Sequence, residues 1–334
     1  MKNNRFLYLD NISGILILNI IYLCHIRIIS VGISDDTFWG IVDNSFFYMI
    51  PWFFFRSGMF YKQEGIIKPI NHTIKKLIIP WIKYSLIAYI IFLFCALMMH
   101  EELSCQRVFF EQITGIIEYG AIPWNQPLWF LVTLFLIRFM YILIEPYIKK
   151  YIISIVSLFL AFYFKEEGLW STFWIGTTCM GIFFLSMGDM LRNIQFNNYV
   201  FSISVLVYCL RYPLNLIDMW DARMNLIGPH DNYFVVMVTM LSGIIMMNNI
   251  FKRWIDIKIP ILSYIGRNSI FFFGFHFPLV MVLYFYILPF FNQTQNIGFI
   301  ISCIIMTIYL ALGVCVYSGK ITTYIKNTLG VKQT

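Results

Sequence analysis

Between Arg267 and Lys320 the chain runs for 52 residues without a single Asp, Glu, Lys or Arg. A helix needs roughly 20 mostly apolar residues to cross the hydrocarbon core of a bilayer, so this stretch is long enough for two crossings. The polar run from Asn292 to Asn296 divides it at a position suited to a turn. The stretch therefore predicts two membrane-spanning helices joined by a short loop.

The remainder of the chain shows the same pattern. Of its 334 residues, 60% are hydrophobic and only 12% are charged, against roughly 25% charged in an average soluble protein. Charge-poor runs predict ten spans, near residues 11–31, 44–61, 77–99, 128–146, 151–165, 171–191, 197–213, 233–251, 269–289 and 298–318. We therefore expect an all-α, polytopic membrane bundle of about ten transmembrane helices. Residues 1–334 are expected to form one membrane-embedded domain, with no separate soluble domain.

The basic residues predict the orientation of this bundle, because Lys and Arg are enriched in loops that stay on the cytoplasmic side. With both termini cytoplasmic, sixteen of the 24 Lys and Arg residues fall on the inside and five on the outside. Twelve of the seventeen carboxylates then lie in outer segments. The pattern predicts cytoplasmic termini and an acidic outer face. The net charge of +7 is explained by this topology, and no basic patch indicates a nucleic-acid partner.

Several kinds of active site have no signature in the sequence. There is no HExxH motif, no CxxC pair and no glycine-rich phosphate loop, so neither a metal site nor a nucleotide-binding fold is predicted. A G-x-S-x-G nucleophile elbow is missing too, which argues against a serine acyl-enzyme. The seven cysteines are interpreted mainly as small buried hydrophobic residues.

Ionisable side chains inside the predicted spans are functional candidates, because each is costly to place in lipid. Five stand out, namely His25, Arg56, Lys83, Arg138 and His276. His25 falls in the outer half of the first span, where a neutral imidazole can be either a general base or a hydrogen-bonded core residue. His276 is followed closely by Pro278, so a structural role in a kinked helix and a chemical role are both open. Arg56 needs a partner or an anionic ligand, whereas Lys83 can reach the cytoplasmic interface.

Tryptophans mark the longest predicted outer segments, at about 100–127 and 214–232. Trp124 is followed by Asn125 and Gln126, and an aromatic ring beside amide groups is a familiar way to hold a sugar. Trp is also enriched at every membrane interface, which is the simpler interpretation of any one of these residues.

Four short motifs follow one another along the chain. They are Leu9-Asp10-Asn11-Ile12-Ser13-Gly14-Ile15 leading to His25, the aromatic run Phe53 to Gly58, Pro127-Leu128-Trp129-Phe130-Leu131, and Gly266-Arg267-Asn268-Ser269 leading to His276-Phe277-Pro278. Together they resemble the acyltransferase-3 family of integral-membrane O-acyltransferases. The resemblance extends over most of the chain and is closest to the fucose 4-O-acetylase-like, polysaccharide O-acetyltransferase branch.

The resemblance implies an enzyme that moves an acetyl group from cytoplasmic acetyl-CoA to a hydroxyl of a cell-surface glycan or glycan precursor. It implies a bacterial-type plasma (inner) membrane and a catalytic general base at His25, the position of the family's essential histidine. The basic residues expected to hold the acetyl-CoA are Arg56, Lys83, Lys76 and Arg267. The residues expected to contact the acceptor are Trp129, Trp124, Asp10 and His276.

One other class of function fits the sequence. A transporter or flippase for a glycan or anionic lipid would also have about ten spans with cations at depth, and would use helices broken by Gly or Pro. Helices that carry Pro51, Pro80 and Pro278 are compatible with it, although the two halves of the chain show no paired repeats. The acceptor glycan, the acyl group and the oligomeric state are not specified by the sequence.

Overall fold

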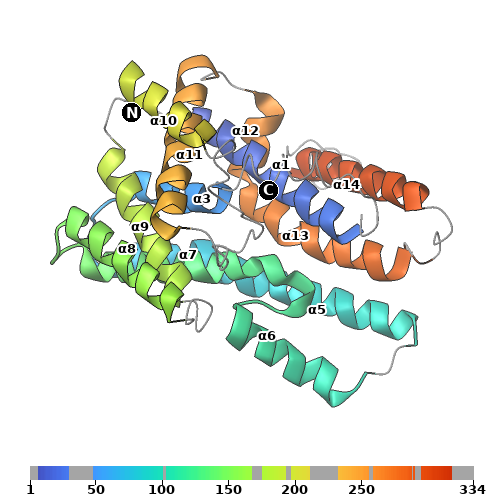
Figure 1. Cartoon of the computed structure of the whole chain (residues 1–334). Coiled ribbons are helices and arrows are strands. Elements are labelled where there is room, and N and C mark those ends of the chain that lie inside the picture. The colour runs from blue at the N-terminus through green and yellow to red at the C-terminus, as the bar shows by residue number, and fades with distance from the viewer. Residues whose placement is uncertain are drawn as a thin grey trace, which may run out of the picture. The chain divides into compact units, whose positions relative to one another are not determined.

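The computed structural model describes residues 7–29, 48–100, 103–167, 175–192, 197–210, 232–255, 259–287, 289 and 295–317, with the side chains of 23–29, 295–299, 301–302 and 316–317 left out. Every regular element among them is a helix, as the sequence predicts (Figure 1). The chain divides into two compact units, one formed by Met1–Ser34 with Ile257–Thr334 and the other by Asp35–Asp256.

Each of the ten segments predicted to span the membrane contains a helix. Four described helices are long and apolar enough to cross a bilayer by themselves, namely Ile67–Met98, Gln106–Ile144, Tyr233–Trp254 and Ser269–Ile287. Shorter apolar helices lie at Leu7–Tyr22, Ile175–Leu191, Asn198–Leu210 and Cys303–Cys315. The chain is thus an all-α protein with several membrane helices. Ten crossings and cytoplasmic termini stay predictions.

The unit that joins the two ends of the chain is built on α1 (Leu7–Ile29). Four elements of the C-terminal part accompany it, namely α12 (Pro260–Arg267), α13 (Ser269–Val282), η5 (Leu283–Ile287) and α14 (Gln295–Tyr317). The backbones of α1 and α12 approach each other at two glycines. A Cβ at Gly14 would collide with the Leu262 carbonyl, and one at Gly266 with the Asp10 carbonyl. Small residues allow such contact between membrane helices.

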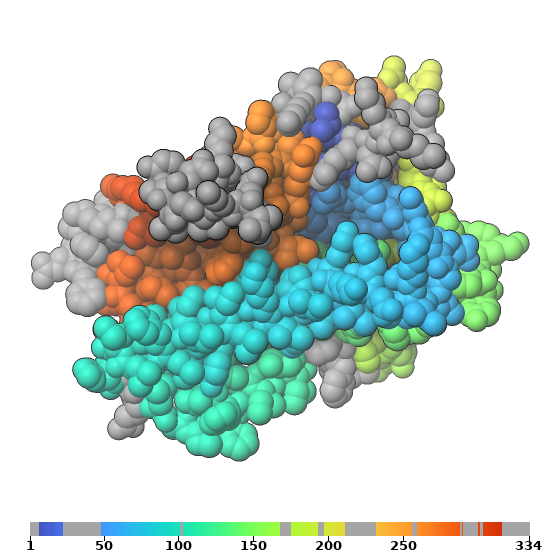
Figure 2. All heavy atoms as spheres, turned by 180° about the vertical axis from the view of Figure 1, so that it is seen from behind, coloured from blue at the N-terminus to red at the C-terminus, as the bar shows by residue number. Residues whose placement is uncertain are grey.

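A long helical hairpin forms one side of the other unit. Its first leg is α4 (Ile67–Thr73), η1 (Ile74–Ile78) and α5 (Ile79–Met98), which continue into one another over 32 residues. At about 1.5 Å per residue this leg is roughly 48 Å long, which exceeds the ~30 Å hydrocarbon core. Large apolar side chains remain exposed along α5, as expected of a surface that meets lipid: Ile79, Ile82, Leu86, Ile90, Phe94 and Leu97. Figure 2 shows this leg along the surface in blue to cyan.

The returning leg is broken in the middle. It consists of η2 (Gln106–Phe110), α6 (Glu111–Tyr119), η3 (Pro123–Leu128) and α7 (Trp129–Ile144). Gly120 ends α6 with a φ of 73°, a left-handed conformation that favours glycine. The indole nitrogen of Trp81 donates to the Gly120 carbonyl at 2.9 Å and so ties the break to α5. The predicted outer segment 100–127 therefore contains the helix α6. The charge-free criterion does not predict this helix, because α6 contains two Glu residues.

Helix α9 (Ile175–Leu191) is the centre of the same unit. It packs against α3 (Met49–Met59), α7 and α8 (Lys150–Glu166). Glycines again allow close approach, because a Cβ at Gly58 would collide with the Leu185 carbonyl and one at Gly188 with the Phe55 carbonyl. The remaining pair, α10 (Asn198–Leu210) and α11 (Tyr233–Trp254), pack on each other. The Trp52 indole joins α3 to α11 by donating to Asn248 at 3.0 Å.

Candidate functional site

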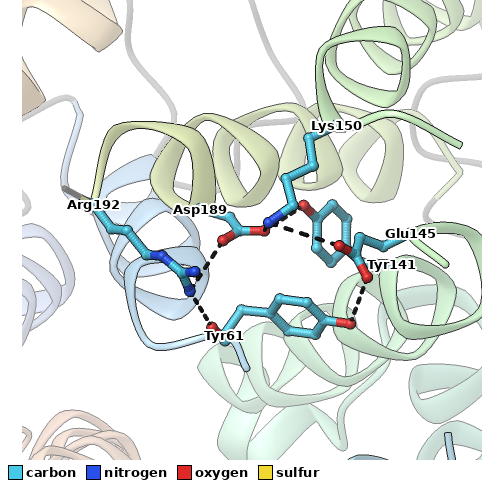
Figure 3. Close-up of polar contacts among 6 residues, drawn as sticks. All are labelled: Tyr61, Tyr141, Glu145, Lys150, Asp189 and Arg192. Carbon is cyan, nitrogen blue, oxygen red and sulfur yellow. Dashed lines mark hydrogen bonds and ion pairs between the residues drawn. The ribbon is translucent and has the colours of Figure 1, made fainter. Parts of the chain in front are cut away.

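A buried carboxylate lies at the end of α9. The side chain of Asp189 is 0% exposed and is surrounded by cations. Lys150 Nζ lies 2.6 Å from Asp189 Oδ2, and Arg192 Nη1 lies 3.3 Å from Oδ1. The Tyr141 hydroxyl donates a hydrogen bond to Oδ2 at 2.9 Å (Figure 3). An ionised carboxylate is tolerated away from water only with such partners.

The network extends from Asp189 to the ends of three other helices. Arg192 donates to the main-chain carbonyl of Tyr61, just beyond α3, at 2.7 Å. The Tyr61 hydroxyl donates to Glu145 Oε2 at 3.4 Å, and Lys150 Nζ lies 3.7 Å from the same carboxylate. The six residues of Figure 3 thus join the ends of α3, α7 and α9 to the start of α8. Two carboxylates balance two cations, so the arrangement stabilises the helix ends and leaves no net charge for a ligand.

Sequence reasoning missed this network. Asp189 lies near the end of the predicted span 171–191, and Lys150 and Arg192 are two of the sixteen basic residues that the topology assigns to the inside. The available signal was a carboxylate within the last residues of an apolar helix, a costly position unless cations lie beside it. The sequence alone does not show which cations pair with Asp189, because Lys150 belongs to another helix and lies 39 positions away in the chain.

Basic side chains gather near the network. Arg138 on α7 is half-buried and interacts electrostatically with both Tyr61 and His72. His72 is exposed, interacts with Lys76 one helical turn further on, and lies in the segment where α4 and η1 pack against α7. We call His72, Lys76 and Arg138 the basic cluster. It belongs to the side predicted to be cytoplasmic, where an anionic ligand such as a phosphate group would meet it.

The other predicted donor-binding residues of this unit have separate surroundings. The Arg56 guanidinium lies 5.7 Å from the ring centroids of both Trp52 and Phe60, within cation–π range. Lys83 is exposed, and its Nζ lies 5.5 Å from the Tyr84 ring centroid. Each cation thus has an aromatic neighbour on its own helix, and no interaction between the two is among the described contacts.

The tryptophans expected to contact the acceptor lie at the break in the hairpin. Trp124 is buried in η3 with its ring centroid 5.3 Å from that of Phe92 on α5. Trp129 begins α7, is half-buried and has its ring centroid 6.3 Å from that of Phe130. Trp124 is thus a packing residue of the hairpin, and Trp129 retains partial exposure.

Two residues with different predicted roles lie together in the other unit. Asp10 on α1 and Arg267 at the end of α12 form a salt bridge, with Arg267 Nε 3.0 Å from Asp10 Oδ2. Beside it, Ser263 Oγ donates to Asn11 Oδ1 at 2.6 Å. This salt bridge joins the motif that contains Asp10 to the motif that contains Arg267, although the two residues are 257 positions apart in the chain. The pairing was not expected, since Asp10 was assigned to the acceptor and Arg267 to the donor.

The two predicted histidines differ in what the structure describes. His25 lies on α1, but its side chain is outside the described residues. His276 on α13 is 0% exposed, and its Nδ1 lies 2.6 Å from the Phe273 carbonyl. In the part of the chain that the structure describes, no three His, Cys, Asp or Glu residues gather as metal ligands would.

Comparison with known protein families matches residues 6–316 to the acyltransferase domain of the acyltransferase-3 family. Comparisons with curated proteins and with solved structures gave no match. The matched region begins before the Asp10 motif, includes all four motifs described above and ends within α14. The chain therefore belongs to the acyltransferase-3 family and is a membrane-embedded acyltransferase.

Proposed function

We propose that the protein transfers an acetyl group from cytoplasmic acetyl-CoA to a hydroxyl of a cell-surface glycan or glycan precursor, in a bacterial-type inner membrane. The family match over residues 6–316 is the observation that carries the proposal. Acetyl-CoA is too highly charged to cross lipid, so the donor has to be bound from the inner face. The acceptor would approach from the acidic outer face, where the chain carries tryptophans.

The reaction needs a proton acceptor and no covalent enzyme intermediate. In the proposed mechanism His25 takes the proton from the acceptor hydroxyl as the oxygen attacks the thioester carbonyl. The tetrahedral intermediate then collapses, its C–S bond breaks, and the leaving CoA sulfur takes the proton from His25, which restores the neutral base. The new bond is an ester to the glycan. A general base of this kind contributes about 100- to 10,000-fold to the rate.

Donor binding is assigned to basic side chains. Arg56, Lys76 and Lys83 are proposed to bind the phosphates of acetyl-CoA, and the position of Lys76 in the basic cluster supports its part in this. Arg138 belongs to the same cluster and adds a guanidinium, which binds phosphate oxygens through two parallel N–H groups. The salt bridge between Arg267 and Asp10 gives both residues a structural task. Their predicted binding roles stay predictions.

The proposal is tested with radiolabelled acetyl-CoA added to membranes from cells that express the protein. Label incorporated into envelope glycan as an alkali-labile ester supports acetyl transfer. His25→Ala is expected to lower that incorporation by about 100-fold or more, because the general base is lost. An equal amount of correctly inserted protein is the required control.

Two results would count against this assignment. Wild-type incorporation by the His25→Ala protein would remove the proposed base. Movement of glycan or lipid across the membrane without any label in the product would favour the transporter instead, for which the break between α6 and α7 is a suitable feature.

A further inference from the structure

His276 has a buried nitrogen atom that no described residue satisfies. Its side chain is fully buried in α13, between the rings of Phe273 and Phe277, whose centroids lie 5.6 and 6.2 Å away. Among the described residues, Nε2 has no hydrogen-bond partner. Unsatisfied buried polar atoms are rare in folded proteins, so each one calls for a specific explanation.

The contact at the other ring nitrogen determines what Nε2 can do. Nδ1 lies 2.6 Å from the Phe273 carbonyl oxygen, which can only accept a hydrogen bond. Nδ1 must therefore carry the hydrogen. In a neutral ring this leaves a lone pair at Nε2, so Nε2 is an acceptor that lacks a donor.

Helix geometry gives the depth of this acceptor. His276 is seven residues beyond Ser269, the first residue of a helix long enough to span the membrane. At 1.5 Å per residue it lies about 10 Å along the axis from that end. Arg267, close to the same end, belongs to the side predicted to be cytoplasmic. The lone pair is thus buried within an apolar helix, about two turns from the end that is predicted to be cytoplasmic.

A purely structural role would not need this nitrogen. The bond from Nδ1 to Phe273 accounts for the orientation of the ring and for its support of the helix before Pro278, which has no N–H of its own. An indole N–H, which comes with no acceptor atom, could donate to the same carbonyl without leaving a buried lone pair. The desolvation cost of burying Nε2 is offset only when a donor forms a hydrogen bond with it.

We propose that Nε2 of His276 accepts a hydrogen bond from an O–H or N–H group of a bound substrate inside the membrane body. The inference rests on the proposed acetyl transfer, whose two substrates each offer such a group. The acceptor brings its hydroxyl, and acetyl-CoA brings the amide N–H groups of its pantetheine arm. His276 contacts substrate under either alternative, and it acts in addition to His25.

Two substitutions separate the two ring nitrogens. His276→Asn places an amide where Nδ1 was, keeps the donor to Phe273 and removes Nε2. His276→Gln reaches the position of Nε2 with an amide that can accept, and loses the bond from Nδ1. Tyr309→Phe is the matched control, because the Tyr309 hydroxyl donates to the Phe272 carbonyl of the same helix at 3.0 Å and does not involve the imidazole.

The experiment measures acetyl transfer from radiolabelled acetyl-CoA in membranes that contain equal amounts of each full-length variant. We expect His276→Asn to lose about 10-fold or more of the activity, as expected for one lost hydrogen bond to a bound substrate. His276→Gln should remain within about threefold of wild type, and Tyr309→Phe should remain close to it. A fall in kcat with unchanged KM for acetyl-CoA assigns the bond to the acceptor hydroxyl. A rise in KM for acetyl-CoA with unchanged kcat assigns it to the pantetheine arm.

Other results overturn the inference. His276→Asn within about threefold of wild type would mean that the Nδ1 contact is all the protein needs, and equal losses in the Asn and Gln variants would mean that only the intact ring matters structurally. If the Asn variant does not accumulate, the Gln variant decides, since its activity depends on an acceptor without the Nδ1 bond. If wild type itself transfers no acetyl group, the proposed function fails and this inference fails with it.

Discussion

At the scale of single residues, two buried polar side chains in the described part of the chain differ in how far their polar atoms are paired. Asp189 has three partners within 3.3 Å, two of them cations. His276 has a partner for one ring nitrogen and keeps the other available. Both positions are costly in lipid. Cations offset the first cost, and in our proposal a bound substrate offsets the second. Burial alone therefore does not distinguish a structural polar residue from a functional one.

The Asp189 network leads to a prediction about stability. Asp189→Asn removes the negative charge between Lys150 and Arg192 and leaves those cations beside a neutral amide. Because Lys150 and Arg192 are about one-third exposed, the cost is below the roughly 3–5 kcal/mol of a fully buried pair and is expected to be about 1–3 kcal/mol. We expect a clear fall in the melting temperature of the detergent-solubilised protein, measured by intrinsic fluorescence.

The exposed pair Lys165–Glu166 provides a matched control. Its atoms lie 3.2 Å apart, but Glu166 is 54% exposed, so Glu166→Gln should cost less than about 1 kcal/mol. Equal melting temperatures for Asp189→Asn and Glu166→Gln would show that the buried network does not stabilise the fold.

At the scale of elements, glycines determine which helices can touch. Gly188 on α9 and Gly58 on α3 bring two backbones into contact, and Gly14 with Gly266 does the same for α1 and α12. The motif Phe53 to Gly58 is thus a packing surface that also carries Arg56. Sequence reasoning recognised the motif but had no means of identifying α9 as its partner.

The close packing of α3 and α9 predicts whether replacing Gly188 by alanine stabilises or destabilises the fold. Within a helix, Gly→Ala is normally favourable by roughly 1 kcal/mol because alanine has the higher helix propensity. At Gly188 the new methyl group would meet the Phe55 carbonyl, and such overpacking costs about 1–3 kcal/mol. We expect Gly188→Ala to lower the melting temperature, and a rise would show that α3 and α9 are not in close contact there.

At the scale of the whole molecule, the sequence predicts an orientation that the fold does not test. Both termini are expected on the cytoplasmic side, since that arrangement keeps sixteen basic residues inside. A green fluorescent protein fused to the C-terminus should fluoresce, whereas alkaline phosphatase fused at the same place should be inactive, because it folds only outside the cytoplasm. An active phosphatase fusion would reverse the topology and place the basic cluster on the wrong side for acetyl-CoA.

The sequence by itself determined that the chain is helical and membrane-embedded. This was possible because lipid imposes a local requirement, an apolar run of sufficient length, which can be read without any knowledge of partners. The same local criterion does not predict the helix α6, whose apolar residues Ile113, Ile116 and Ile117 are flanked by Glu111 and Glu118. It also identified His25 and His276 as unusual without showing what either contacts.

Only the tertiary structure decided which polar residues meet. The salt bridge of Asp10 with Arg267, the ion pair of Asp189 with Lys150 and the unpaired Nε2 of His276 all depend on segments brought together by packing. Hydropathy is a sum over neighbours in the chain, whereas a salt bridge or an unsatisfied acceptor is a relation between groups in space. For that reason the membrane helices could be predicted from the sequence, and the pairing of their polar side chains could not.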